Sequence, residues 1–234
     1  MMACATLPLA DGRRLKAVEA KVGPRFVHIV EDNATFRKTL EGRLREFGYE
    51  VSTYPSAQHL LDRLPSDDVP SCLLLDVRLP GMSGPELQER LIELSSTLPI
   101  IFLTGYSDIP TTVRTIKAGG QDFLIKPVSS EQLLEAVERA IAHHNAVLNL
   151  RHAREVVLSR IATLTPRERQ VFDLVIRGGT NKDVARALSC TERTVKAHRH
   201  SVMEKMQVQT LAELVSLAER VGVLDSASSS RKSA

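Results

Sequence analysis

The chain of 234 residues contains no tryptophan, and only 4% of it is aromatic. Its three cysteines, Cys4, Cys72 and Cys190, are far apart and odd in number. This argues against a disulfide framework or a zinc site and is typical of the reducing cytosol. No apolar run approaches the roughly 20 residues that a membrane-spanning helix needs, and charged residues interrupt the N-terminal segment before it could form a secretory signal. These absences predict a cytoplasmic protein without a membrane partner.

The composition that is present suits two domains with different tasks. Hydrophobic residues make up 43% of the chain and charged residues 25%, so it can bury a core and remain in solution. The length is comfortable for two domains. Residues 26–130 hold 10 lysines and arginines against 14 acidic residues, whereas residues 151–234 hold 15 against 9. An acidic first half and a basic second half indicate that the second half binds nucleic acid.

The first half alternates between short apolar runs and segments of helical spacing. Such alternation predicts a doubly wound, flavodoxin-like α/β fold, in which five parallel strands are joined by right-handed crossovers and covered by helices on both faces. The expected strands are residues 26–30, 49–54, 72–75, 99–103 and 122–125, and the helices that follow them begin near Asn33, Ser56, Pro85, Pro110 and Ser130.

Polar residues follow four of these strands. They are Glu31-Asp32, Asp76, Thr104 and Lys126, and the carboxyl ends of parallel strands meet at the edge where such sheets bind ligands. Clustered carboxylates need a neutralising cation, and oxygen ligands suit Mg²⁺. One aspartate could then act as a nucleophile in phosphoryl transfer, with the lysine and the hydroxyl holding the phosphoryl group. Taken singly, Asp76 could merely cap a turn and Lys126 could be an ordinary surface lysine.

Four motifs give this half a resemblance to the receiver domain of bacterial two-component response regulators. They cover residues 26–145 and read Val30-Glu31-Asp32, Leu75 to Gly84 (LDVRLPGMSG), Leu103-Thr104-Gly105 and Phe123 to Pro127 (FLIKP). The resemblance implies that Asp76 accepts a phosphoryl group from a sensor histidine kinase. It also implies that Mg²⁺ is bound by Glu31, Asp32, Asp76 and the backbone carbonyl of Arg78.

The same resemblance assigns roles in switching. Thr104 would contact the phosphoryl oxygens and Lys126 their charge, and the Lys126-Pro127 peptide bond is expected to be cis. Phe123 would turn inward as Thr104 moves toward the phosphoryl group, although Phe123 can equally be a core residue. The glutamate at position 31 departs from the aspartate more usual in the family, which could change the affinity for the metal.

The segment after the receiver-like part contains no proline or glycine over residues 146–162, so we expect a semi-rigid helical linker there. His143 and His144 precede it, and adjacent residues on a helix point to different sides. We therefore favour solvated histidines over a metal site.

Residues 163–223 predict an all-α domain of four short helices joined by tight turns, as in helix-turn-helix proteins. Its third helix, from Glu192 to Met206, is amphipathic: Val195, Val202 and Met206 can face the core, while basic side chains project outward. A basic face can be a solvated surface, but in this setting it favours binding in the major groove of DNA.

Motifs in this part resemble the LuxR/FixJ-type DNA-binding domain. They are Leu164 to Glu168 (LTPRE), Asn181 to Ala185 (NKDVA) and Thr194 to His198 (TVKAH). The resemblance implies that Lys196, Ala197 and His200 approach base edges. Phosphate contacts would come from Arg193, Thr194 and Arg199, and the last helix would pair two DNA-bound domains.

Together the halves resemble response regulators of the FixJ/NarL type, close to those that control aromatic-hydrocarbon catabolism. The expected order is an N-terminal extension (1–25), a receiver domain (26–145), a linker (146–162), a DNA-binding domain (163–223) and a disordered tail (224–234). This implies a regulator that dimerises on phosphorylation, binds double-stranded DNA and activates transcription with RNA polymerase. Two alternatives remain: a phosphatase that uses Asp76 as its nucleophile, and a DNA-binding module with a vestigial receiver.

Overall fold

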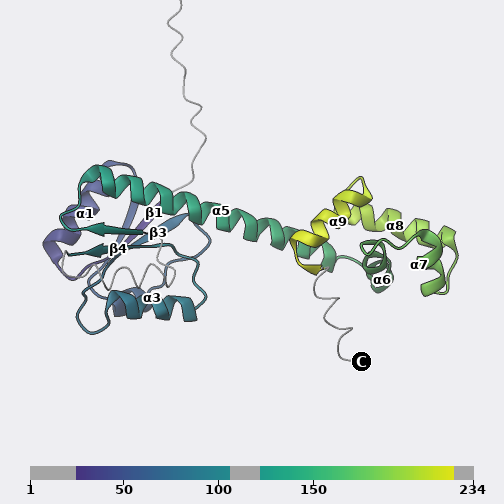
Figure 1. Ribbon diagram of the computed structural model, residues 1–234, viewed down its shortest axis with the longest axis horizontal. Helices are drawn as coiled ribbons and strands as arrows, with labels where there is room; N and C mark the ends of the chain where they lie inside the picture. The colour runs from purple at the N-terminus through teal and green to yellow at the C-terminus, as the bar shows by residue number, and fades with distance from the viewer. Residues whose placement is uncertain (1–24, 106–121, 224–234) are drawn as a thin grey trace, which may run out of the picture. The chain divides into compact units, whose positions relative to one another are not determined.

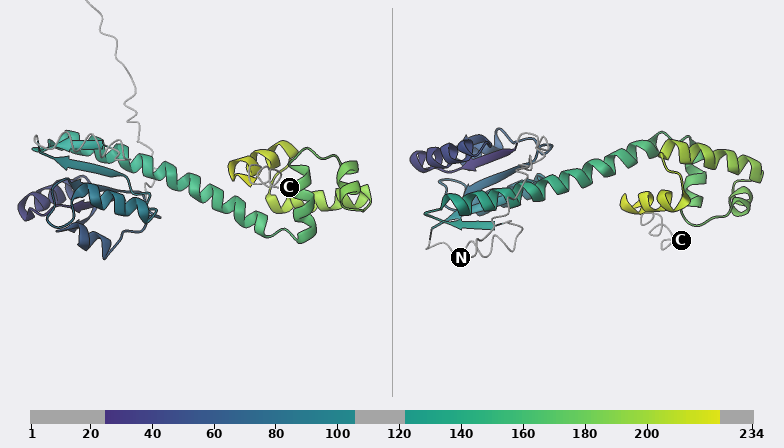
Figure 2. Two further views of the ribbon diagram at one scale, coloured as in Figure 1. Left: turned by 60° about the horizontal axis from the view of Figure 1, so that its bottom comes forward. Right: turned by 90° about the horizontal axis from the view of Figure 1, so that it is seen from above.

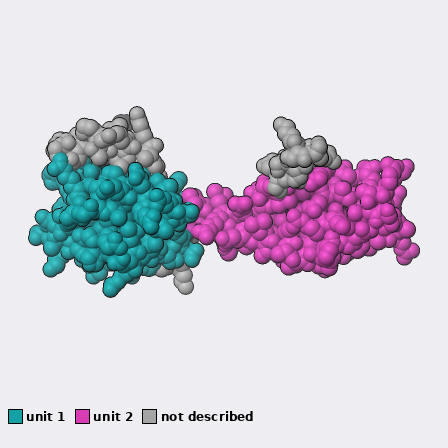
Figure 3. Space-filling model, turned by 90° about the horizontal axis from the view of Figure 1, so that it is seen from below, with its two compact units in different colours: residues 1–144 teal, residues 145–234 magenta. Residues whose placement is uncertain are grey.

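A computed structural model describes residues 25–105 and 122–223 of the chain. The chain divides into two compact units, residues 1–144 and 145–234 (Figure 3), and each unit has its own hydrophobic core. Three expectations lie outside the described residues: almost all of the N-terminal extension, the helix from Pro110 to Ala118 and the disordered tail.

The first unit is built on a five-stranded parallel sheet in the order β2-β1-β3-β4-β5. Figure 1 labels β1, β3 and β4 of this sheet. All six residues of β3 are buried, which explains its nearly continuous apolar sequence, because a central strand of such a sheet is covered on both faces. The predicted α/β fold is therefore confirmed. The strands are β1 (Phe26–Val30), β2 (Glu50–Tyr54), β3 (Ser71–Asp76), β4 (Ile100–Thr104) and β5 (Asp122–Ile125).

Helices cover both faces of this sheet (Figures 1 and 2). On one face, α1 (Ala34–Glu46) and the first part of α5 (Ser130–Ala162) pack their apolar stripes on the strands. On the other, α2 (Ala57–Leu61) and α3 (Gly84–Glu93) do the same. Alternate residues of each strand point to opposite faces, so a single sheet contributes to two cores.

Helix α5 is continuous over 33 residues. The expectation that both His143 and His144 are solvated is wrong for His144. His144 is not solvated, because it lies on the buried side of α5 in line with Val137 and Ile141 and is fully buried. Its Nδ1 lies 3.1 Å from the amide nitrogen and 3.0 Å from the carbonyl oxygen of Ser71, at the start of β3. His143 points to the other side and is exposed, as the helical geometry requires.

The second unit consists of the end of α5 and four helices around one core. Each of the four begins at a threonine whose side chain accepts a hydrogen bond from a backbone amide in the first turn, which is a strong signal for a helix start. The expected four-helix arrangement is confirmed. The helices are α6 (Pro166–Val175), α7 (Asn181–Ala187), α8 (Glu192–Met206) and α9 (Leu211–Arg220).

Within residues 25–105 and 122–223, none of the helices is both long enough and apolar enough to cross a membrane.

Candidate functional sites

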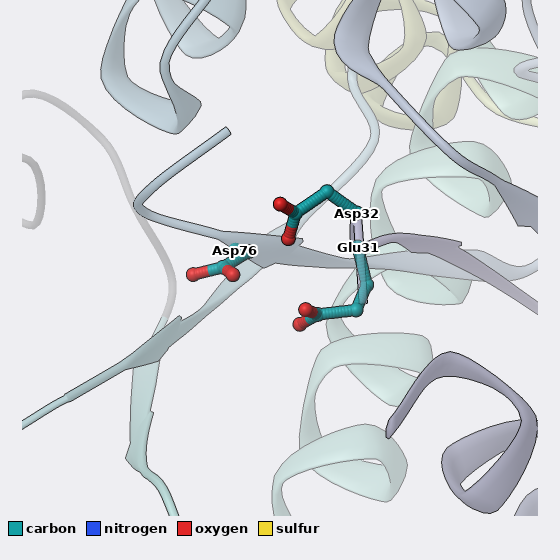
Figure 4. Close-up of side chains that lie close together, drawn as sticks. All are labelled: Glu31, Asp32 and Asp76. Carbon is teal, nitrogen blue, oxygen red and sulfur yellow. The ribbon is translucent and has the colours of Figure 1, made fainter. Parts of the chain in front are cut away.

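Three carboxylates converge at the carboxyl edge of the sheet. Glu31 and Asp32 directly follow β1, and Asp76 is the last residue of β3. Val30 pairs with Leu75 in the sheet register, so the two strands end at the same level. One oxygen from each of the three side chains lies within 4.8 Å of the others, and the side chains turn toward a shared space (Figure 4). This set of oxygen donors fits Mg²⁺, a cation that binds oxygen ligands and usually keeps several of its waters.

Lys126 joins two of these carboxylates. Its Nζ lies 2.6 Å from Oε2 of Glu31 and 2.9 Å from Oδ2 of Asp76, and 4.6 Å from the centre of the Phe36 ring. The lysine follows β5, whereas Glu31 follows β1 and Asp76 ends β3, so its contacts connect the two strands on either side of β4 and reach as far as β1. The structure thus brings an ammonium group directly against Asp76.

Burial and ion pairing shape the charges of this cluster. Burial raises the pKa of Glu31, and the nearby Asp76 carboxylate acts in the same direction against the hydrogen bond from Lys126. Burial disfavours the charged form of Lys126, but its hydrogen bonds to Glu31 and Asp76 outweigh this and raise the pKa of its ammonium group. The lysine therefore stays cationic where it faces the two carboxylates.

Thr104 is the last residue of β4, and Phe123 is the second residue of the neighbouring strand β5. Thr104 ends β4, is fully buried and donates a hydrogen bond from Oγ1 to the carbonyl of Gly105. Phe123 is half-buried and packs against the core beneath α2 and α3. The peptide bond between Lys126 and Pro127 is cis, as expected.

The loop after β3 approaches Asp76 closely. The backbone amide of Arg78 donates to Oδ1 of Asp76 at 3.1 Å, and the Gly84 amide donates to the carbonyl of Val77 at 3.1 Å. A Cβ atom at position 84 would overlap the backbone carbonyl oxygen of Asp76. Glycine is therefore required where α3 begins, a role that the motif around it did not reveal.

The second candidate site is the outward face of α8. Arg193, Lys196, Ala197 and His200 are exposed, and Thr194 is partly buried. Val195, Val202 and Met206 are buried, as predicted. The structure therefore presents a basic surface on the helix that follows the tight turn after α7, the place of the recognition helix in helix-turn-helix domains.

Arg199 differs from its neighbours on α8. It is partly buried, and its Nη1 donates to Oδ1 of Asn181 at 2.9 Å. Asn181 is the first residue of α7, so this bond links the two helices of the helix-turn-helix. The resemblance offered Arg199 only as a phosphate contact, and the helical spacing gave no sign of this partner 18 residues away.

Two family models match the parts of the chain that hold these candidate sites. The family models for the response regulator receiver domain and for bacterial regulatory proteins of the luxR family match residues 27–138 and 162–218. Nodulation protein W of Bradyrhizobium diazoefficiens is 42% identical over 85% of this chain and 87% of its own. Response regulator protein TodT of Pseudomonas putida is 37% identical over 92% of each chain. The solved structure of response regulator StyR is 41% identical, covers 85% of this chain and all of its own, and has a TM-score of 0.77.

A receiver fold with an acidic edge, followed by a helix-turn-helix domain, defines a class of transcription regulators controlled by phosphorylation. The chain belongs to the two-component response regulators of the FixJ type, with a LuxR-type DNA-binding domain. The receiver domain implies a histidine kinase as partner, and the LuxR-type domain implies DNA. Because the family consists of regulators, the phosphatase alternative is wrong.

A partly buried ion pair joins two helices of the second unit, α6 and α8. Oε2 of Glu168 on α6 accepts hydrogen bonds from Nζ of Lys205 on α8 at 2.6 Å and from the amide of Thr165 at 2.8 Å. The bond from Lys205, followed by that from the Thr165 backbone, lowers the pKa of Glu168 to about 2. Glu168 therefore connects the start of α6 to the C-terminal end of α8, the helix that carries the basic surface.

We expect Glu168→Gln to destabilise the second unit by about 2 kcal/mol, because it removes a charge-assisted hydrogen bond from a buried group. A carboxylate whose pKa is depressed on folding stabilises the fold above its unfolded pKa of about 4.3 and loses that contribution as pH falls toward the folded value. The free energy of unfolding of the second unit should therefore decrease between about pH 5 and pH 2, and it should decrease more steeply in wild type than in the variant.

Hydrogen exchange of amides in α6 and α8 measures this unfolding in the full chain. Glu192→Gln is the matched control, because Glu192 is an exposed glutamate of α8. A variant as stable as wild type at neutral pH, with the same dependence on acid, would show that the Glu168–Lys205 pair contributes nothing.

Proposed function

We propose that Asp76 accepts a phosphoryl group from a sensor histidine kinase, and that this modification makes the chain dimerise and bind paired DNA half-sites. The observation that carries the proposal is the contact between Lys126 and Asp76 at the edge of three clustered carboxylates. A lysine ammonium placed there can stabilise the negative charge on a phosphoryl group attached to Asp76, where a surface lysine could not.

In the proposed reaction, an oxygen of Asp76 attacks phosphorus as the bond from phosphorus to the donor, a kinase histidine nitrogen, breaks. Glu31, Asp32, Asp76 and the backbone carbonyl of Arg78 would hold Mg²⁺, which neutralises charge on the transferring oxygens. Lys126 offsets the remaining charge. Glu31 and Asp32 directly follow β1, and Asp76 is the last residue of β3. The sheet therefore orients the attacking oxygen before the donor arrives.

Phosphorylation would then change the state of Thr104 and Phe123. A phosphoryl group gives the Thr104 hydroxyl a charged acceptor in place of the Gly105 carbonyl to which it now donates. Movement of Thr104 would leave room for Phe123, which is only half-buried, to turn inward. Thr104 pairs with Ile125 and Phe102 pairs with Phe123, so the two residues lie on neighbouring strands. Their movements would together alter the surface of the receiver domain near β4 and β5, which suits an interface with a second copy.

On DNA, we propose that Lys196, Ala197 and His200 approach base edges, while Arg193, Thr194 and Arg199 contact phosphates. Two copies would place two α8 helices in successive major grooves, which matches paired half-sites. Activation of transcription through RNA polymerase, in the cytoplasm, completes the proposal. The alternative with a vestigial receiver has the same DNA contacts but no dependence on phosphorylation.

The test is the affinity of the full chain for a DNA duplex selected by the phosphorylated protein from a random-sequence pool. We expect treatment with acetyl phosphate and Mg²⁺ to raise this affinity by about tenfold or more, within the usual range of coupling between two sites. Sedimentation should show the shift from monomer to dimer in parallel. Equal affinity with and without the phosphodonor, in protein shown to be phosphorylated, would favour the vestigial receiver.

A further inference from the structure

We infer that Arg37 is a positioning residue for the phosphorylation site, because it holds the backbone of the two acidic residues after β1 in the orientation that metal binding requires. The inference rests on the proposed Mg²⁺-dependent phosphorylation of Asp76. Arg37 belongs to none of the motifs that pointed to the site, and no role followed from its place on α1.

The contacts of Arg37 are with the main chain. Its Nη1 donates to the carbonyl oxygen of Glu31 at 2.5 Å and to that of Asp32 at 3.1 Å. The two carbonyls belong to successive peptide groups, and one guanidinium nitrogen binds both. The planes of these peptides set the directions in which the Glu31 and Asp32 side chains leave the backbone. By holding both peptides, the guanidinium orients two of the three carboxylate side chains.

The rest of the loop is held around the same point. Asn33 accepts hydrogen bonds from the amides of Thr35 and Phe36 through Oδ1, which begins α1. The Arg37 amide donates to the Asn33 carbonyl at 2.9 Å. The Asn33 amide donates to Oε1 of Glu31 at 3.3 Å. Arg37 therefore joins the hydrogen-bonded start of α1 to a loop whose acidic side chains face the shared space of the carboxylates.

Position and charge have opposite effects on cation affinity here, which makes the inference testable. If Arg37 acted only through its positive charge, replacing it with a neutral residue would remove repulsion and strengthen Mg²⁺ binding. If it acts by orienting the carboxylates, the same replacement lets the loop relax and weakens binding. Groups that orient metal ligands in this way are commonly worth 10- to 100-fold in affinity.

The experiment measures Mg²⁺ affinity of the full chain by calorimetric titration for wild type, Arg37→Gln and Arg37→Lys. We expect Arg37→Gln to bind Mg²⁺ about tenfold or more weakly. Arg37→Lys should fall between the two, since an ammonium can donate to the carbonyls but lacks the planar guanidinium. Arg45→Gln is the matched control: it lies on the same helix and pairs with Glu41 and the Val51 carbonyl, so its loss should leave Mg²⁺ affinity unchanged.

Thermal unfolding in a chelator separates positioning from stability, because a purely structural role would lower the melting temperature without a specific loss of Mg²⁺ affinity. Equal or tighter binding by Arg37→Gln overturns the inference. If that variant does not fold, Arg37→Lys decides: weaker binding supports the inference, and wild-type affinity overturns it. A wild type that binds no Mg²⁺ would overturn the proposed function and this inference together. If wild type binds Mg²⁺ and the Arg37 variants bind it equally well, only the inference about Arg37 is overturned.

Discussion

Replacing Asp76 with asparagine is expected to abolish covalent phosphorylation by acetyl phosphate. The amide has nearly the same shape, but it is not a nucleophile toward phosphorus and carries no charge for Mg²⁺ or Lys126 to bind. Asp76 is 8% exposed, and its Oδ1 already accepts the Arg78 amide at 3.1 Å, so asparagine can keep the backbone contact through its own carbonyl oxygen. The loss should therefore reflect chemistry and not a collapsed loop.

The measurement is the intact mass of the full chain after incubation with acetyl phosphate and Mg²⁺. Wild type should gain one phosphoryl group, and the gain should disappear when the metal is chelated. Asp62→Asn is the matched control, because Asp62 is an exposed aspartate of the same unit at the end of α2. A phosphoryl gain in Asp76→Asn equal to that in wild type would show that another residue is the acceptor.

The second large effect is expected on α8. Lys196→Ala should weaken binding to the selected DNA duplex by roughly 10- to 100-fold, since a lost base-edge contact costs about 1–3 kcal/mol. Lys196 is exposed, so the fold of the second unit should not change. Arg193→Ala should act differently: as a phosphate contact, it should weaken binding to all duplexes and reduce the salt slope by about one.

Titrations at several salt concentrations, with the selected duplex and with an unrelated one, distinguish these two roles. Arg154→Ala is the control for charge, because Arg154 is an exposed arginine of the linker part of α5. If Lys196→Ala and Arg154→Ala weaken binding to the two duplexes by the same factor, Lys196 does not read bases. A variant of Lys196 with wild-type affinity for the selected duplex would show that Lys196 makes no contact with DNA.

Much of the fold could be predicted because local patterns and local geometry agree. The apolar run before Asp76 predicted a buried strand, and all six residues of β3 are buried. The capping pair of Thr165 and Glu168 predicted the start of α6, and both hydrogen bonds of that pair are present. These features depend on neighbours a few residues apart, whose faces follow from the periods of helix and strand.

The carboxylate edge could also be predicted, because parallel strands necessarily place their carboxyl ends together. Glu31 and Asp76 were expected to lie near each other on this ground, and they do. The contact of Lys126 with both could be expected only in general terms, since a lysine side chain can reach many positions from one backbone site. Packing against Phe36 and the strand ends selects a single one.

By itself, the sequence determined the α/β and helical units, the order of their elements and the strand ends that carry the acidic residues. All of these follow from hydrophobic periodicity, turn residues and the geometry of parallel sheets. Only the tertiary structure decided which long side chains meet distant partners. Arg37 binds the carbonyls of Glu31 and Asp32, His144 binds the start of β3, and Arg199 binds Asn181. A flexible or aromatic side chain on a helix has several possible partners, and the one it binds depends on how whole elements pack, which no local pattern records.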